Sequence, residues 1–203
     1  GPEVTDSVLE QALVDVISKT SAGDIVVLSG SLPRGASIDT YGRWTRALRD
    51  AGLKVYLDAD GAALSAGLEQ KPYFTKPNDH ELSAMLGREL VDVDAIATAA
   101  SEIVASGIDT VCVSMGGNGA VYATIDEVWY ASPVKVKVGS TVGAGDSVVA
   151  AFAFADAQGL STEDALRLAM ATGAANVMES GTQAAERSVV DSLIKKVQLT
   201  RLQ

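Results

Sequence analysis

The residues best suited to chemistry form one short segment, Thr141-Val142-Gly143-Ala144-Gly145-Asp146-Ser147. Gly143, Ala144 and Gly145 have almost no side chain, so the backbone can approach a ligand closely. An alanine-rich helical pattern follows, and the free N–H groups and macrodipole of a helix start form an anion site. A carboxylate at Asp146 could accept a proton from an attacking hydroxyl beside phosphate oxygens. The segment predicts phosphoryl transfer; the alternative is a tight turn followed by an ordinary helix charge.

Four further segments rich in glycine and polar residues each follow a predicted strand. They are Ser29–Gly35, Asp58–Gly61, Lys76–Glu81 and Ser114–Gly119. In an open parallel sheet, ligands bind at the carboxyl ends of the strands. We therefore expect all four segments to lie at the edge of the sheet where the ligand binds.

Alternating strands and helices position these segments. Helical periodicity covers residues 8–17, 41–51, 62–68, 79–86, 94–106, 143–156, 162–178 and 188–197. Strand patterns cover residues 25–28, 53–57, 73–75, 110–114, 121–123, 128–130 and 134–138. The run Ile25-Val26-Val27-Leu28 is typical of a strand buried on both faces. This alternation predicts an α/β fold of the doubly wound class, with a mostly parallel sheet and helices on both faces.

Composition limits the possible function classes. The 203 residues suit one domain, and the net charge of −10 argues against non-specific binding to nucleic acid. No apolar run approaches the roughly 18 residues of a membrane span, and the start, Gly1-Pro2-Glu3, is not a signal peptide. A single cysteine, Cys112, excludes an internal disulfide and a cysteine metal cage. These features predict a cytoplasmic protein without nucleic-acid or membrane partners.

Five motifs, in this order and spacing, resemble the PfkB family of ribokinase-like sugar kinases. They are Ser29-Gly30-Ser31-Leu32-Pro33, Leu57-Asp58 before Gly61-Ala62-Ala63-Leu64, Lys76-Pro77-Asn78 with Glu81-Leu82, Ser114-Met115-Gly116 with Gly119-Ala120, and residues 141–147. The resemblance extends over essentially the whole chain, so residues 1–203 look like the C-terminal portion of a ribokinase-like kinase domain. It implies ATP and Mg²⁺ as cofactors and a sugar as phosphoryl acceptor.

Within the family, the motif at residues 29–33 combined with that at 140–147 resembles the branch that acts on phosphorylated sugars. Residues 31–35 and 197–199 look more like members that convert fructose 1-phosphate to fructose 1,6-bisphosphate. The stretch 76–90 looks equally like those that act on fructose 6-phosphate, and tagatose 6-phosphate is a third candidate. The implied substrate is a phosphorylated ketohexose, with fructose 1-phosphate preferred.

The resemblance also implies roles for individual residues. Asp146 would be the base that deprotonates the sugar hydroxyl, and it would touch the substrate. The amides of Gly143, Ala144 and Gly145 would hold the developing charge on the transferred phosphoryl group. Ser31 would contact the phosphosugar, although its loop could equally be a simple strand-to-helix connection.

The metal and the nucleotide phosphates are assigned to the segment after the third strand. Asn78 and Glu81 would share one face of a helix start and hold Mg²⁺, preferably through water, and Asn78 would also contact the nucleotide. The pair equally fits a capping box.

Lys76 would neutralise nucleotide phosphates; the alternative is an exposed lysine that ends a strand. Asp58 and Asp60 could position substrate or metal, but a helix N-cap is the commoner role.

The remaining nucleotide contacts are assigned to Ser114, Gly116, Gly119 and Thr141. The alternative for the first three is a hairpin turn, which their residue types favour.

A helix near the C-terminus carries Ala171, Gly173 and Ala174, which could admit adenine or allow close helix packing, and the sequence does not separate these alternatives. A monovalent-cation site near Gly181-Thr182 is a further possibility.

The helical start at Thr5 suggests entry into the middle of a larger fold. The family's N-terminal part supplies a first strand, an acidic sugar-binding residue and lid strands that form a homodimer. The resemblance implies that this part, about a hundred residues at roughly 30 residues per βαβ unit, is missing before Gly1. The alternative to a complete kinase is therefore a nucleotide-binding module that binds ATP weakly and turns over little sugar by itself.

Overall fold

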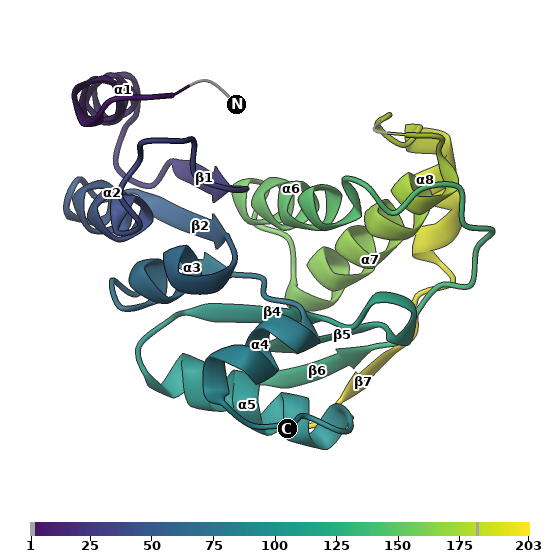
Figure 1. The fold of residues 1–203 in the computed structure, drawn as a ribbon. Helices are drawn as coiled ribbons and strands as arrows, with labels where there is room; N and C mark the ends of the chain where they lie inside the picture. The colour runs from purple at the N-terminus through teal and green to yellow at the C-terminus, as the bar shows by residue number, and fades with distance from the viewer. Residues whose placement is uncertain (1–2, 182) are drawn as a thin grey trace.

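A seven-stranded sheet with helices on both faces forms the computed structural model, which describes residues 3–181 and 183–203 (Figure 1). The strands lie side by side in chain order: β1 (Ile25–Ser29), β2 (Lys54–Asp58), β3 (Phe74–Thr75), β4 (Thr110–Ser114), β5 (Ala120–Ala123), β6 (Val128–Ala131) and β7 (Leu199–Arg201). β1 to β4 are parallel, and β5 to β7 add antiparallel strands. The predicted α/β fold with helices on both faces is confirmed.

The helices form one layer on each face of the sheet. The first layer holds α1 (Asp6–Lys19), α2 (Thr40–Asp50), α3 (Gly61–Leu68), α4 (Asp79–Leu86) and α5 (Val93–Ala105). The second holds α6 (Ala144–Ala157), α7 (Thr162–Met178) and α8 (Arg187–Ile194) (Figure 1). In the described parts of the chain, no helix combines the length and the apolar character needed to cross a membrane.

Alternating side chains on the central strands explain the two layers. On β4, Val111 and Val113 belong to a core cluster with helices α4 and α5. Cys112, between them, belongs to a second cluster with α6 and α7, which includes Phe152 and Leu166. All three β4 side chains are fully buried. A continuous apolar run is therefore required here, because successive strand residues face opposite, equally covered sides.

The predicted strand over residues 134–138 is wrong. Val134 and Val136 pack, partly buried, against the core cluster of α7 and α8, while Lys135 and Lys137 are exposed. The alternating pattern therefore reflects packing on one side without sheet pairing. The edge of β6 is instead paired with β7, a strand that was not predicted.

The prediction that β1 is buried on both faces is also wrong. β1 lies at one edge of the sheet, and its Val27 side chain is 42% exposed. α1, beside it, has no fully buried residue, although Leu13 and Val16 pack against the core. This corner of the fold therefore has less cover than the β4 region.

Candidate active site

The candidate site lies where the parallel strands end. β1 ends at Ser29 and β2 at Asp58, and these two residues are partners in the register of the sheet. Beyond β3, Asn78 forms an isolated bridge with Ser114 at the end of β4, and the Ser114 amide donates to the Pro77 carbonyl at 3.0 Å. The four predicted strand-end segments therefore share one edge of the sheet.

Asp146 lies in the first turn of α6, opposite the end of β1. The Ser29 hydroxyl donates a hydrogen bond to Asp146 Oδ1 at 3.1 Å. Both residues are exposed, so a substrate can reach the carboxylate. Ser29 was not among the predicted site residues. Its one signal in the sequence is that it directly follows the apolar run 25–28, where a parallel strand presents side chains to the ligand edge.

The start of α6 presents free backbone amides. Gly143 is the N-cap residue, in the left-handed region with φ of 83°, and it makes no side-chain cap. The Ala144 amide donates to the Thr141 carbonyl at 3.3 Å, so this member of the predicted anion hole is already engaged. Within the described chain, the amides of Gly145 and Asp146 donate to no carbonyl oxygen. Two free N–H groups therefore point out of the positive end of the helix.

Lys76 brings a positive charge to the same point. Its side chain is only 7% exposed, so the alternative of an exposed lysine is wrong. Its Nζ lies 3.3 Å from Asp58 Oδ1 and would lie 3.2 Å from a Cβ added to Gly145. The absence of a side chain at Gly145 thus leaves room for the ammonium group beside the free amides.

Asp58 carries the most perturbed carboxylate of this edge. Burial raises the pKa of Asp58; the nearby Lys76 ammonium opposes this, and the negative charges of Asp146 and Glu81 add to it. The N-cap alternative for Asp58 is wrong, because the N-cap residue of α3 is Asp60, which makes no side-chain cap. Asp58 thus lies between the positive charge of Lys76 and the negative charges of Asp146 and Glu81.

Asn78 and Glu81 form the capping box of α4. The Glu81 amide donates to Asn78 Oδ1, and the Asn78 amide donates to Glu81 Oε2, both at 2.8 Å. Each residue therefore commits one oxygen to the helix start. Among the described residues, no group of three or more acidic, histidine or cysteine side chains could hold a metal ion directly. The structure thus establishes the capping role, and any metal role needs ligands beyond these two oxygens.

The Ser114–Gly119 segment is a hairpin connection. β4 and β5 pair antiparallel on either side of it, with Ser114 opposite Ala120. Gly119 has φ of 94°, and a Cβ there would collide with the Ala131 carbonyl oxygen, so packing alone requires this glycine. Gly116 has φ of 54°, and a Cβ there would meet nothing. The predicted hairpin is confirmed, and the backbone at Gly116 borders open space.

Tyr41 holds the loop after β1, a function that the sequence did not reveal. Its hydroxyl donates to the carbonyls of Ser29, at 3.0 Å, and Gly30, at 2.9 Å. The Gly30 amide in turn donates to the Asp58 carbonyl at 3.0 Å. Ser31 follows in this fixed loop and is exposed. Tyr41 lies on the buried face of α2, where an aromatic residue normally indicates core packing.

The small residues of α7 pack against neighbouring helices. A Cβ on Gly173 would lie 2.7 Å from Val148 Cγ2 of α6. Ala171 is fully buried and Ala174 partly buried, both in the cluster with α8. Close helix packing therefore accounts for all three positions. Of the suggested monovalent-cation site, Thr182 lies outside the described residues.

Comparison with known proteins gives consistent matches. The model of the pfkB family of carbohydrate kinases matches residues 3–188. The chain is 38% identical over 204 residues to a 1-phosphofructokinase of Haemophilus influenzae and 37% identical to one of Bacillus subtilis. It is fully covered in both alignments but spans only 65% and 66% of those relatives.

A solved structure of Escherichia coli phosphofructokinase-2 in complex with substrates and products superimposes with a TM-score of 0.90 at 33% identity. This match covers 97% of the chain and 64% of the solved chain. Family model, sequence relatives and fold agree over almost all of the described residues. The chain therefore belongs to the pfkB family of carbohydrate kinases.

Proposed function

We propose that the whole protein to which this chain corresponds transfers a phosphoryl group from ATP to a phosphorylated ketohexose. Fructose 1-phosphate is the proposed acceptor and fructose 1,6-bisphosphate the product. The observation that carries the proposal is the meeting of the exposed Asp146 carboxylate, the free amides of the α6 start and the buried Lys76 ammonium. An acceptor hydroxyl needs a base, and a phosphoryl group in transit needs positive and N–H groups close by.

Each of these groups has one proposed task. Asp146 accepts the proton of the attacking hydroxyl, and the Ser29 hydrogen bond fixes the orientation of its carboxylate. The open amides of Gly145 and Asp146, next to the left-handed N-cap residue Gly143, stabilise charge on the transferred phosphoryl oxygens. Lys76 lies close enough to the same amides to neutralise the nucleotide phosphates.

The nucleotide is proposed to lie over the hairpin after β4. Ser114, Gly116 and Gly119 would line its path, and Thr141 would meet it from the loop before α6. Gly116 supports this, since its backbone faces open space. Ser31, held in the Tyr41-anchored loop, is the proposed sugar-phosphate contact.

Magnesium fits the carboxylates of this site when it is held through water. The negative charges of Asp146 and Glu81 act on Asp58, and a divalent cation with oxygen ligands would offset the charge of these three carboxylates. Glu81 has one carboxylate oxygen, Oε1, outside the capping box, whereas the single side-chain oxygen of Asn78 already accepts the Glu81 amide. When bound, Mg²⁺ would neutralise phosphate charge.

The choice of sugar rests on the named relatives. Two 1-phosphofructokinases align with the entire chain, which supports fructose 1-phosphate. Fructose 6-phosphate is the second candidate, favoured by the similarity to phosphofructokinase-2 in complex with fructose-6-phosphate, at a TM-score of 0.88. Tagatose 6-phosphate is the third.

The substrate is tested by coupled ADP release from the full-length protein with each of the three sugar phosphates. We expect the highest kcat/KM with fructose 1-phosphate. A higher kcat/KM with fructose 6-phosphate or tagatose 6-phosphate would make that sugar the assigned substrate. Absence of turnover with all three would reject the phosphosugar assignment.

A second candidate function is a nucleotide-binding module with little catalysis by itself. Two observations favour it: the chain spans only about two thirds of its relatives, and among the described strands β1 pairs with β2 alone, which leaves one edge of the sheet unpaired. An unpaired edge can accept a further strand. In the whole protein we propose a cytoplasmic homodimer, to be checked by light scattering beside the 203-residue chain.

A further inference from the structure

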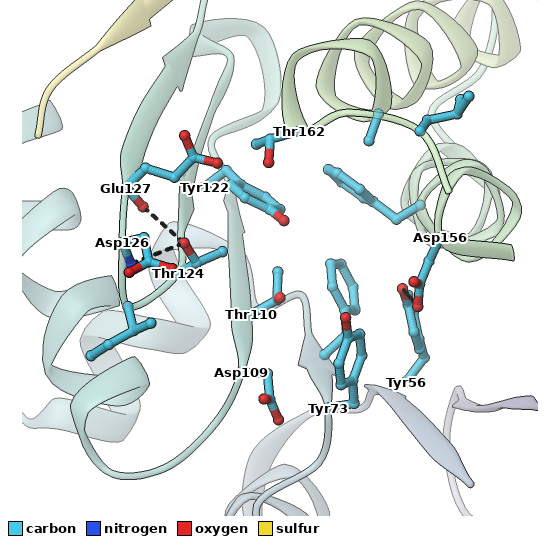
Figure 2. Close-up of a pocket in the computed structure, with 15 residues that line it drawn as sticks. Tyr56, Tyr73, Asp109, Thr110, Tyr122, Thr124, Asp126, Glu127, Asp156 and Thr162 are labelled. Carbon is cyan, nitrogen blue, oxygen red and sulfur yellow. Dashed lines mark hydrogen bonds between the residues drawn. The ribbon is translucent and has the colours of Figure 1, made fainter. Parts of the chain in front are cut away.

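A cavity of about 400 Å³ lies at the end of the sheet opposite the candidate active site (Figure 2). Asp109 and Thr110, at the start of β4, line it, whereas Ser114 of the candidate site ends the same strand. Asp156, near the end of α6, closes another side, ten residues beyond Asp146. The two sites thus share β4 and α6 but use opposite ends of them.

Aromatic rings form the wall of this cavity. Tyr56 stacks on Phe74 with ring centroids 4.6 Å apart, and Phe152 lies 5.2 Å from Phe74. Tyr122 stacks on Phe152 at 5.6 Å, and Tyr73, just before β3, extends the row with its centroid 6.0 Å from that of Tyr56. Because each ring packs on its neighbour, the wall is preformed. Its rings are buried except that of Tyr73, which is partly exposed.

The charge at the cavity has one sign. Four carboxylates line it, those of Asp109, Asp126, Glu127 and Asp156 (Figure 2). No lysine, arginine or histidine of the described chain is among its lining residues. Two cations adjoin the cavity: Lys54 pairs with Asp156 at 2.7 Å, and the nearby Arg201 helps to lower the pKa of Glu127. Asp109 and Asp126 remain as exposed rim carboxylates.

Lys54 also shows what the aromatic wall accepts. Its ammonium lies 4.5 Å from the centroid of the Tyr73 ring. A cation beside a tyrosine ring is attracted by the negative π face, and a carboxylate at the rim adds to that attraction. At the edge of this cavity, one cation of the chain itself, Lys54, is therefore held by a tyrosine ring and a carboxylate together.

The polar groups inside the cavity can accept hydrogen bonds. Thr110 is 7% exposed and Tyr122 is 9% exposed, and both hydroxyls face the cavity (Figure 2). Burial raises the pKa of Tyr122 to about 12, so its hydroxyl stays neutral. A guanidinium or ammonium group has only hydrogen-bond donors, and these hydroxyl oxygens, like the carboxylates, can accept hydrogen bonds from it.

We infer that this cavity binds a small organic cation that carries a guanidinium or ammonium group. The cation lies beside Tyr73, the least buried of the three tyrosines, and points its N–H groups toward the acidic rim. ATP and sugar phosphates are excluded, since their charges would face four carboxylates. The site is separate from the proposed phosphoryl transfer, because neither Asp146 nor Lys76 lines it.

The test is a calorimetric titration of the 203-residue chain with agmatine, which carries a guanidinium and an ammonium group but no carboxylate. At about 20 mM salt, where exposed charges are weakly screened, we expect saturable binding at one site. Butylurea, a neutral compound with a similar planar head group, should not bind. Absence of saturable agmatine binding would overturn the inference.

Paired variants locate the site. Asp109 and Asp126 are exposed, so D109N/D126N should fold normally and weaken agmatine binding about tenfold. The control, E89Q/D94N, removes two exposed charges outside the cavity lining and should leave the affinity unchanged. Tyr73→Leu, which removes one ring face, should weaken binding several-fold in a manner insensitive to salt. Equal affinities for the two double variants would overturn the location, as would competition by Mg·ATP.

Discussion

The two ends of the sheet differ in side-chain size, in charge and in what they can bind. At the carboxyl end, glycines and a helix start expose backbone amides, and a buried lysine lies beside them. At the opposite end, large aromatic rings and carboxylates surround a cavity without a basic lining residue in the described chain. The same elements, β4 and α6, serve both ends. The comparison shows that the free helix amides and the buried lysine distinguish the two ends, because carboxylates lie at both.

The largest expected effect concerns the base at the carboxyl end. Asp146→Asn in the full-length protein should lower kcat by about a hundredfold or more, because the amide cannot accept the hydroxyl proton. Binding of ATP should be nearly unchanged, as measured by calorimetry beside the coupled assay. The matched variant Asp156→Asn, on the same helix at the other end, should keep kcat within about threefold, since it lies far from the reacting groups. Near-native turnover by Asp146→Asn would remove this residue as the base.

The second effect compares the two lysine–carboxylate pairs. Lys76→Met leaves the mostly buried Asp58 carboxylate unpaired and should reduce the free energy of unfolding by about 3 kcal/mol. Lys54→Met should cost about 1 kcal/mol, because Lys54 is 35% exposed and Tyr56 still donates to Asp156 at 3.1 Å.

Urea unfolding of the two lysine variants measures this difference. Adding Asp58→Asn to Lys76→Met should restore part of the lost stability, because the unpaired buried charge is then removed. Equal losses for the two lysines would contradict the description of Lys76 as the buried partner.

A smaller effect is the opposite pH dependence of two carboxylates. The pKa of Asp58 is raised by burial above its ordinary value of 3.8. Its contribution to stability is therefore present below that ordinary value and is lost as the pH rises through the raised pKa. The pKa of Glu127 is lowered from 4.5, first by a hydrogen bond from Thr162. Its contribution is present above 4.5 and is lost as the pH falls through the lowered pKa.

Asp58→Asn and Glu127→Gln test these signs when each is unfolded by urea at several pH values between about 3 and 7. The stability advantage of the parent chain over Asp58→Asn should shrink as the pH rises. Its advantage over Glu127→Gln should grow over the same range. The same slope for both variants would show that the two ends do not differ electrostatically as described.

Local patterns in the sequence were sufficient for most of the fold. The buried strand 110–114 and the capping box of Asn78 and Glu81 are written in neighbouring residues, and both were predicted. The prediction of a strand over residues 134–138 is wrong, because alternating apolar residues show that one face of a segment is covered but not whether a sheet or a helix covers it. The prediction of a fully buried β1 fails for a similar reason, since an apolar run does not reveal that its strand lies at an edge.

In the candidate site too, features formed by neighbouring residues were predictable, and features formed by residues far apart in the chain were not. The glycine-rich start of α6 and Asp146 were predicted because they are contiguous in the chain. The Ser29–Asp146 hydrogen bond joins residues 117 positions apart, and no local pattern contains it. The burial of Lys76 depends on the space left by Gly145, again through tertiary structure. The aromatic cavity was not predicted, because its rings come from separate strands and helices.

The central claim, that the α6 start and Lys76 form a nucleotide-phosphate site, is tested most directly by calorimetric titration of the 203-residue chain with Mg·ATP. The account predicts weak but saturable binding at one site, weakened about tenfold or more by Lys76→Met at a temperature where this variant is still folded. Lys54→Met should bind with the parent affinity. Absence of saturable binding, or equal affinities for the two lysine variants, would contradict the account.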